Sequence, residues 1–312
     1  MLMNRTQDPG CPLYVSDLDG TLVHCGRLDP ESVRLLNSAI HRGVLVTFAT
    51  ARSWTSARRL LTGVELSLPL VLHNGSVTLD PLIDRPVTIR TIAQALAHKI
   101  VLKAAHAGLC PMVHVVTDRE LTAWCSETED RYVRAFWAGR SRDPRQAPVE
   151  NIGALPIDDV VGVVALGERR QVERLRNDLE EDLGAAVSTA LRRPSAPEEG
   201  WWLEVTAAGV SKGTAVRELA DQLGIHRVVS FGDELNDLSL FASSDESYAV
   251  GNAPREVRQA ASGQLGTDPI EVAAWIANRG VAKVRRSPPA GNGGEPRIGG
   301  VENQLDISGV ES

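Results

Sequence analysis

Two aspartates near the start of the chain, Asp17 and Asp19, directly follow a short apolar run, and Gly20 and Thr21 come next. The apolar run predicts the end of a buried strand, which is where open α/β sheets bind their ligands. Two carboxylates so close together repel each other unless a cation or a shared proton relieves them, and Mg²⁺ prefers such oxygen ligands. Gly20 permits a tight turn, and Thr21 offers a hydroxyl and an N–H group to an anion. A solvated turn often has similar residues, so this stretch indicates a catalytic or binding site only in combination with other polar stretches of the chain.

Two further polar stretches could contribute to a site for a phosphate-like anion. Thr50-Ala51-Arg52 follows the apolar run 44–48 and offers a hydroxyl for an oxygen and a guanidinium to neutralise charge. A helix N-cap followed by a solvated arginine is the structural alternative. Lys212 stands at the start of a predicted helix, where the helix dipole disfavours a cation. A carboxylate or an anionic ligand beside Lys212 would explain this position, although most lysines simply lie at the surface.

The last stretch follows the apolar run 228–231 and brings Gly232, Asp233, Asn236 and Asp237 into one turn. Asp233 could complete a shell of oxygen ligands around Mg²⁺, and Asn236 and Asp237 could orient that shell. Together the four stretches supply what phosphoryl transfer needs: a carboxylate nucleophile, a cation that screens it, donors for the phosphoryl oxygens, and an acid or base.

Short strands and helices alternate in the parts of the chain that hold these stretches. Strands are predicted at 13–15, 44–48, 68–72, 228–231 and 246–250. Helices are predicted between them, and the first opens at Asp29-Pro30, an N-cap acid followed by proline. This alternation predicts an α/β fold with a parallel sheet and right-handed crossovers.

The regular alternation of short strands and helices stops after the third predicted strand, at 68–72, and returns near Val210. A helix is predicted over 89–107, and further strands and helices follow it as a separate α+β unit. We therefore expect a core domain in two parts, 11–79 and 195–282, an inserted unit over 80–194, and a tail over 283–312. The tail is rich in Pro, Gly, Ser and charge without periodicity, which predicts disorder.

The composition of the whole chain limits its partners. The 312 residues suffice for two ordinary domains, and the formal net charge of −7 disfavours nucleic acid and anionic membranes as partners. No apolar run is long enough for a membrane span, and residues 1–11 lack an apolar signal segment. The four cysteines are scattered, which argues against a zinc site or a disulfide framework. We expect a cytoplasmic monomer or homodimer, and the net charge does not argue against a small phosphorylated metabolite as its partner.

Four motifs in this order resemble those of the haloacid dehalogenase (HAD) superfamily of phosphohydrolases, in its Cof-type branch. They are Asp17-Leu-Asp19-Gly20-Thr21-Leu22, Thr50-Ala51-Arg52, Gly209-Val-Ser-Lys212-Gly, and Gly232-Asp233-Glu-Leu-Asn236-Asp237. Asn74-Gly75 and Ala249-Val-Gly-Asn-Ala253 also match, and the resemblance spans residues 13–280. One such motif is weak evidence, but four in order at predicted strand ends are specific.

The resemblance implies a Rossmann-like, doubly wound parallel-sheet core with an inserted α+β cap that closes over the site and selects the substrate. It implies a Mg²⁺-dependent phosphatase that hydrolyses a small phosphomonoester, such as a sugar phosphate, through an aspartyl-phosphate on Asp17. Asp19 would be the general acid and base, and Lys212 would also steady Asp17. The implied phosphate-binding residues are Thr50, Ala51, Arg52, Lys212 and Asn236; the implied metal ligands are Asp17, Asp233 and the Asp19 carbonyl; and the implied supporting residues are Gly20, Thr21, Asn74, Gly75, Gly232 and Asp237.

The sequence departs from the family pattern in two places. The second motif usually reads Thr-Gly-Arg, and Ala51 replaces the glycine, which should be tolerated if its φ is negative. The fourth motif lacks the usual Met and has Leu240-Phe241 instead, which changes packing.

Two other functions stay open from the sequence alone. One is phosphoryl transfer to another hydroxyl, as in phosphomutases, and the other is non-catalytic metabolite binding. Several aromatic, basic and histidine side chains could contact the substrate or only pack, namely Trp124, Trp137, Trp201, Trp202, Arg140, Arg145, Arg192, Arg193, His24, His73 and His114.

Overall fold

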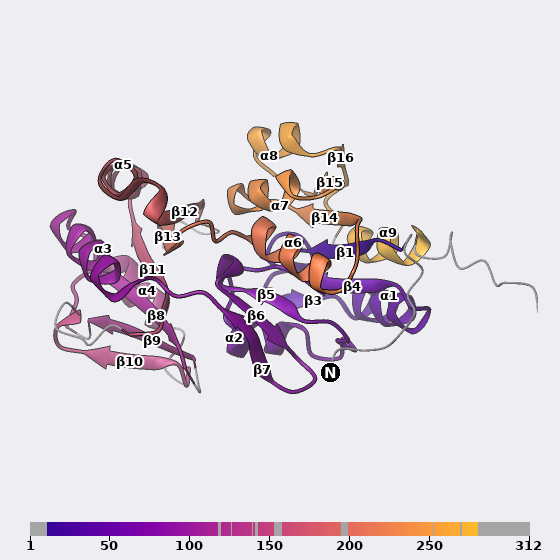
Figure 1. Cartoon of the computed structure of the whole chain (residues 1–312), viewed down its shortest axis with the longest axis horizontal. Coiled ribbons are helices and arrows are strands. Elements are labelled where there is room, and N and C mark those ends of the chain that lie inside the picture. The colour runs from indigo at the N-terminus through magenta and orange to yellow at the C-terminus, as the bar shows by residue number, and fades with distance from the viewer. Residues whose placement is uncertain are drawn as a thin grey trace, which may run out of the picture.

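Two units lie side by side, each built around its own sheet (Figure 1). The computed structural model describes residues 11–117, 120–125, 127–138, 140, 143–152, 158–194, 199–251, 253–268 and 270–279. We name the unit that contains the first strand the core and the inserted unit the cap. None of the helices in these ranges combines the length and the apolar composition of a membrane span.

The core sheet is parallel throughout, with the strand order β16-β15-β14-β1-β4. Its strands are β1 (Leu13–Ser16), β4 (Leu45–Phe48), β14 (Val228–Gly232), β15 (Glu246–Ala249) and β16 (Gly263–Gln264). β1 therefore lies between one strand from the first part of the chain and one from the last part. The predicted parallel α/β sheet is confirmed, and it joins both ends of the described chain.

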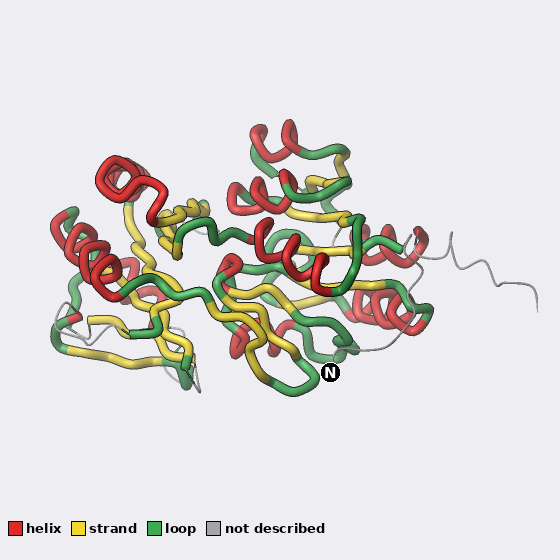
Figure 2. Tube along the Cα trace, viewed as in Figure 1, coloured by secondary structure: helices red, strands yellow, loops and turns green. Residues whose placement is uncertain are grey.

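Helices cover both faces of the core sheet, as the red helices around the yellow strands show (Figure 2). The helices of one face are α1 (Pro30–His41), α2 (Trp54–Leu60) and α9 (Glu271–Arg279), and those of the other are α6 (Lys212–Gln222), α7 (Leu238–Ala242) and α8 (Arg255–Ala260). Successive strand residues point to opposite faces. Tyr14 and Phe231 therefore pack in the first layer, while Leu13 and Val15 pack in the second. These two layers confirm a doubly wound core.

The first part of the core continues into a small antiparallel sheet. Its strands are β5 (Leu70–Leu72), β6 (Val77–Asp80) and β7 (Arg85–Ile89). β5 runs beside β4 through a parallel bridge between Ala49 and Val71. Pairing with β6 keeps β7 extended, and α3 (Gln94–His106) starts only afterwards. The predicted helix over 89–107 is therefore wrong at its start.

The cap sheet has the strand order β10-β9-β8-β11-β13-β12. Its strands are β8 (Pro111–Val116), β9 (Glu120–Cys125), β10 (Gln146–Val149), β11 (Val160–Gly167), β12 (Val187–Arg192) and β13 (Trp201–Ala207). α3 and α5 (Arg169–Leu183) cover one face, and α4 (Arg131–Ala138) covers part of the other. The rest of this second face meets the core, where His114 lies beside His73 and Glu204 contacts Asn74.

Strand pairing divides the chain differently from the division expected from sequence. β13 falls within the expected core range 195–282, but it pairs with β11 and β12 in the cap sheet. β7 falls within the expected cap range 80–194, but it pairs with β6 of the core. On this pairing we propose that the cap comprises residues 91–207.

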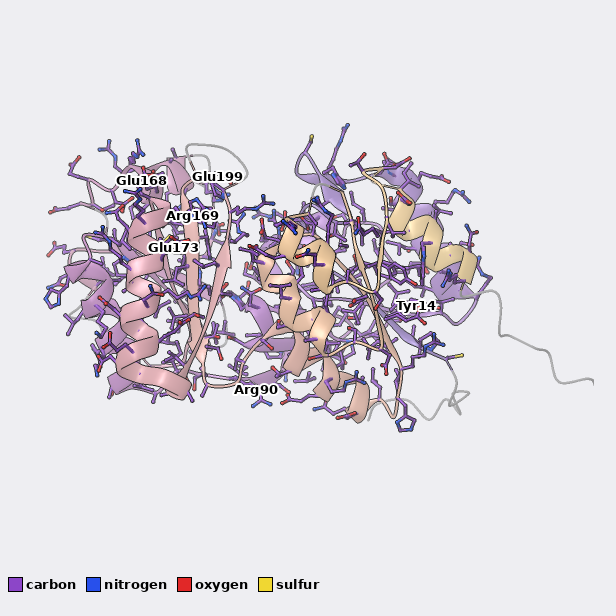
Figure 3. All side chains as sticks on the ribbon, turned by 90° about the horizontal axis from the view of Figure 1, so that it is seen from above. Tyr14, Arg90, Glu168, Arg169, Glu173 and Glu199 are labelled. Carbon is purple, nitrogen blue, oxygen red and sulfur yellow. The ribbon has the colours of Figure 1, made fainter. Side chains whose placement is uncertain are left out.

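Arg90 marks the first junction between the units. Its Nη2 atom lies 2.5 Å from Glu218 Oε2 on α6, and Figure 3 shows its side chain near the junction. The predicted tail over 283–312 lies outside the described residues.

Glu120 of the cap holds the start of core helix α2. Its carboxylate accepts the N–H groups of Trp54 at 2.6 Å and Thr55 at 2.8 Å, and it lies 3.3 Å from His73 Nε2. Burial alone would raise the pKa of Glu120, but the contacts with His73 and Thr55 outweigh burial and lower the pKa to about 2. Glu120 is therefore an ionised contact that binds the cap to the core.

Glu120→Gln is expected to remove a pH-dependent part of the stability. A carboxyl group whose pKa is lowered on folding stabilises the protein above its unfolded pKa, and this stability is lost as pH falls toward the folded pKa of about 2. At pH 6 the variant should lose about 2–3 kcal/mol of unfolding free energy, and the difference from wild type should shrink between about pH 4.5 and 2.5. Urea unfolding at several pH values measures this.

The matched control is Glu173→Gln, which removes an exposed ion pair with Arg169 on α5. This control should change the unfolding free energy by less than about 0.5 kcal/mol. A Glu120→Gln variant whose stability varies with pH as the wild type's does would contradict the prediction.

Candidate active site

Asp17 directly follows β1 and is buried against Lys212. Lys212 Nζ donates to Asp17 Oδ1 at 2.6 Å and to Asp237 Oδ1 at 2.7 Å. Ser211 caps α6 by accepting the Thr214 N–H group at 3.1 Å, which sets Lys212 in the first helical turn. Burial alone would lower the pKa of Lys212, but the two carboxylates outweigh burial and raise it. Lys212 therefore lies beside a carboxylate, as the sequence suggested, and it contacts two of them, Asp17 and Asp237.

Asp233 follows β14 and lies in a turn that Asp237 organises. Asp233 Oδ1 accepts the Thr21 hydroxyl at 2.9 Å. Asp237 Oδ2 accepts the N–H groups of Asp233 and Glu234, each at 3.0 Å. Asp237 ends the 3₁₀ turn η4 (Leu235–Asp237) and is fully buried. One carboxylate thus fixes both the loop after β14 and the ammonium group of Lys212.

Two glycines keep this region open. A Cβ atom on Gly20, whose φ is +83°, would lie 2.1 Å from Asp233 Oδ2. A Cβ atom on Gly232 would lie 2.5 Å from Asp237 Cγ. Both positions therefore require glycine because the backbone passes so close to a carboxylate.

Carboxylate oxygens of Asp17, Asp233 and Asp237 all lie within 4.8 Å of one another. Burial raises the pKa of Asp17 to about 7 and that of Asp233 to about 8, and neighbouring carboxylates add to both shifts. The group has excess negative charge in a buried place, which an oxygen-preferring divalent cation would offset. The all-oxygen donor set fits such a cation, and Gly20 lets the Asp233 carboxylate lie close to the backbone of the first motif.

Asp19 is paired with Arg52 rather than grouped with the other carboxylates. Arg52 Nε donates to Asp19 Oδ2 at 2.6 Å, and Nη2 donates to Oδ1 at 2.7 Å. Burial alone would raise the pKa of Asp19, but the hydrogen bonds and charge of Arg52 hold it below its usual range. The Thr50 hydroxyl accepts the Arg52 N–H group at 3.2 Å, and Ala51 does not have a positive φ. Alanine therefore fits where the family has glycine.

Asn74 and Asn236 meet although they lie on separate loops. Asn236 Nδ2 donates to Asn74 Oδ1 at 3.1 Å, and Asn74 Nδ2 donates to Glu204 Oε2 of β13. Asn74 has a left-handed backbone (φ 50°, ψ 27°) within the short turn η1 (His73–Gly75). Both amides line a cleft of about 600 Å³ between the core and the cap. The two predicted residues are therefore joined to each other and to the cap.

Sequence reasoning missed Glu120 and Glu204, the two acids through which the cap contacts the core. Glu204 interrupts the apolar run of β13, and a lone acid in such a run signals a buried hydrogen-bond partner. Glu120 stands at the edge of its strand and carries no comparable signal.

The tryptophans of the cap serve mainly in packing. Trp124 and Trp137 stack with ring centroids 5.5 Å apart, and Trp202 lies beside Phe136 in the same cluster under α4. Trp201 lies in the cluster on the opposite face of the cap sheet. These positions favour the packing alternative over stacking on a substrate.

The basic and histidine candidates have different surroundings. Arg193 Nε donates to Glu234 Oε2 at 3.1 Å, which brings the cap to the loop after β14. The guanidinium groups of Arg140 and Arg192 lie over aromatic rings, and Arg145 is paired with a neighbouring aspartate. His73 and His114 lie at the contact between the units, and His24 lies on the short hairpin of β2 (Val23–His24) and β3 (Arg27–Leu28).

Residues 14–275 match the family of haloacid dehalogenase-like hydrolases. The chain belongs to this family. The match includes both parts of the core and the whole cap, and it confirms the Cof-type resemblance of the four motifs. The chain is therefore an enzyme of this hydrolase family, with a Rossmann-like core and an inserted cap.

Among curated proteins, the chain is similar to the 5-amino-6-(5-phospho-D-ribitylamino)uracil phosphatase YcsE of Bacillus subtilis. The two are 24% identical over 261 residues, which cover 82% of this chain and 90% of YcsE. It is also similar to the HMP-PP phosphatase of Serratia proteamaculans, with 26% identity over 252 residues that cover 77% of this chain and 84% of that protein.

A solved structure of a haloacid dehalogenase-like hydrolase from Bacteroides thetaiotaomicron has the same fold. The TM-score is 0.71 at 19% sequence identity, and the match covers 86% of this chain and 99% of that chain.

Proposed function

We propose that this enzyme is a Mg²⁺-dependent phosphatase that hydrolyses a small phosphomonoester through an aspartyl-phosphate on Asp17. The observation that carries the proposal is the group of Asp17, Lys212, Asp233 and Asp237, in which the buried ammonium group of Lys212 contacts Asp17 and Asp237, and Asp233 lies beside both carboxylates. The phosphatase names of both curated relatives support the same reaction class. We favour a sugar phosphate or a related metabolite, because YcsE is named for a phosphorylated ribitylamino compound.

In the first step, a carboxylate oxygen of Asp17 attacks the phosphorus atom, and the bond to the ester oxygen breaks. Asp19 gives a proton to the departing oxygen, and to carry that proton it must first leave the ion pair with Arg52 that holds it ionised in this structure. Lys212 offsets the negative charge beside Asp17, while the Thr50 hydroxyl and the Asn236 amide bind phosphoryl oxygens. The products of this step are the free alcohol and the aspartyl-phosphate.

In the second step, water attacks the phosphorus atom of the aspartyl-phosphate, and the bond to Asp17 breaks. The proton of the water passes to Asp19, and inorganic phosphate leaves. The ion pair with Arg52 favours the ionised form of Asp19, which is the form that accepts this proton.

The metal ligands in this proposal are Asp17, Asp233 and the backbone carbonyl of Asp19. Bound there, Mg²⁺ supplies positive charge that offsets the carboxylates and the phosphoryl oxygens. Asp237 already accepts Lys212 and two N–H groups, so we assign it the role of orienting the loop behind the metal.

A phosphate-release screen of the purified protein tests the proposal. The panel comprises sugar, polyol, nucleotide and cofactor phosphates, each assayed with Mg²⁺, with EDTA, and with Mg²⁺ restored. We expect release from at least one class, loss of release with EDTA, and recovery with Mg²⁺. The absence of turnover across the panel would contradict the proposal and favour a non-catalytic binding protein.

Gly20→Ala is expected to weaken activation by Mg²⁺. The new Cβ atom would crowd Asp233 Oδ2, so the Mg²⁺ concentration for half-maximal activity should rise about tenfold or more. Gly26→Ala is the matched control, because Gly26 has a similar φ of +73° with nothing within 4 Å of its Cβ position. Titration of phosphate release with Mg²⁺ measures both variants, and equal effects would show that backbone strain, rather than crowding of Asp233, is responsible.

A further inference from the structure

The amide of Asn74 joins three separate segments of the molecule. Its backbone N–H group donates to the Thr50 carbonyl oxygen at 3.1 Å. Its Oδ1 atom accepts Asn236 Nδ2 at 3.1 Å, and its Nδ2 atom donates to Glu204 Oε2. One residue thus connects a cap strand to the two loops that bind the phosphoryl group in the proposed function.

Glu204 determines which way these amides face. An asparagine amide can adopt two orientations that exchange its oxygen and its NH₂ group. Burial raises the pKa of Glu204, while the charge of His73 and the hydrogen bond from Asn74 act in the opposite direction. In its ionised form Glu204 only accepts hydrogen bonds, so the Asn74 NH₂ group then faces Glu204 and the Asn74 oxygen faces Asn236, as the contacts in the structure have them. Asn236 in turn must present its own NH₂ group to Asn74. A single acceptor in the cap therefore selects the orientation of both amides.

The surroundings of Glu204 are unusual for a residue that only packs. Its exposed fraction is 2%, and its Oε1 atom has no hydrogen-bond partner within the described residues. Gly162 on the neighbouring strand β11 lies beside this oxygen, at a distance where a Cβ atom would be in ordinary contact with Oε1 at 3.4 Å. A buried carboxylate with an unpartnered oxygen costs stability, so packing alone does not explain an acid at this position.

We propose that Glu204 is a positioning residue of this enzyme: it orients Asn74 and, through Asn74, holds Asn236 toward the phosphoryl group. The loop that carries Asn236 is then held in its phosphate-binding position only while the cap contacts the core. This inference rests on the proposed phosphatase function. The contact of Arg193 with Glu234 brings the cap to the same loop and is consistent with such coupling.

A donor–acceptor swap between Glu204 and Asn74 tests the proposal. Glu204→Gln lets two amide orientations compete, and kcat/KM for p-nitrophenyl phosphate should fall about tenfold. Asn74→Asp places a second buried carboxylate against Glu204, and the fall should be about 100-fold. The double variant Asn74→Asp/Glu204→Gln restores one donor facing one acceptor and keeps an acceptor for Asn236. Its activity should return to within about threefold of wild type, because the two positions are coupled.

Two further measurements separate positioning from a structural role. In an Asn236→Ala background, Glu204→Gln should not lower kcat/KM further, because the Asn236 amide that Glu204 positions is already absent. The effect of Glu204→Gln should also be equal for p-nitrophenyl phosphate and for a larger metabolite, because it acts at the phosphoryl group and not at the leaving group. A swap without recovery, or an undiminished Glu204→Gln effect in the Asn236→Ala background, overturns the proposal.

Ser76→Ala is the matched control. It removes another buried hydrogen bond between core and cap, from Ser76 Oγ to the Val161 carbonyl oxygen at 2.7 Å. This variant should lower the melting temperature but leave kcat/KM within about twofold of wild type.

Nuclear magnetic resonance of the side-chain amides tests the same contact without turnover. Glu204→Gln should shift the side-chain amide signals of both Asn74 and Asn236, and Ser76→Ala should not shift that of Asn236. If no substrate is hydrolysed, the proposed function is wrong, but these amide signals still show whether Glu204 orients Asn74 and Asn236. An unchanged Asn236 signal in Glu204→Gln overturns the inference.

Discussion

Asp17→Asn is expected to abolish phosphate release from p-nitrophenyl phosphate in Mg²⁺, with kcat lower by at least about 10⁴-fold. An amide is a poor nucleophile and cannot form the aspartyl-phosphate. Asp17 is buried against Lys212 and lies within reach of two other carboxylates, so the substitution changes the chemistry at the centre of the site. Release of p-nitrophenol and of inorganic phosphate measures the effect, and full activity in the variant would exclude Asp17 as the nucleophile.

Asp143→Asn is the control for this prediction. Asp143 is an aspartate of the cap with a largely buried side chain that is paired with Arg145 at 2.6 Å and is not one of the three grouped carboxylates. Activity should stay within about threefold of wild type, because only a structural ion pair is changed. The same assay with an added alcohol separates hydrolysis from transfer, since a phosphorylated product in place of free phosphate would favour a phosphomutase-type reaction.

Lys212→Met is expected to have the second largest effect. Lys212 donates to both Asp17 and Asp237, so its loss leaves two buried carboxylates without this cation. The unfolding free energy should fall by about 3–5 kcal/mol, and kcat should fall at least about 10³-fold. Urea unfolding at pH 7 and phosphate release measure the two effects. Since Mg²⁺ offsets the same negative charge, the stability loss should be smaller in saturating Mg²⁺.

The control is Lys99→Met, which removes an ion pair with Asp182 on the surface of the cap. Lys99 Nζ lies 2.9 Å from Asp182 Oδ1, and the Lys99 side chain is 46% exposed. The change in unfolding free energy should be less than about 1 kcal/mol. Wild-type turnover in Lys212→Met would rule out a role for this ammonium group at the phosphoryl group.

The parts of the site at strand ends could be predicted from sequence because their placement follows from topology. Asp17, Thr50 and Asp233 each follow a predicted strand of one parallel sheet. The carboxyl ends of parallel strands meet at one edge, so these residues had to converge. Lys212 was predictable for an electrostatic reason, since a cation at a helix start needs a negative partner.

Other parts of the fold and of the site depend on which distant segments of the chain meet, and the local sequence pattern does not show this. The apolar run of β13 predicts a strand, but such a run fits both an edge of the core sheet and a place in the cap sheet. Likewise, the residue types at Arg52 and Asp19 do not show that the two form a bidentate pair. The contact of Glu204 with Asn74 also depends on how the cap docks.

The place of β1 between β4 and β14 also has a consequence for synthesis. Until β14 leaves the ribosome, one side of β1 is an unpaired edge that can associate with other extended chains. β14 follows β1 by roughly 200 residues, a delay of about 10–40 s at about 5–20 residues per second. Among the residues that the structure describes, the cap strands pair with one another, and they come from one continuous segment, so the cap sheet can form during this interval. The nascent core is therefore most exposed to aggregation while the cap is being made.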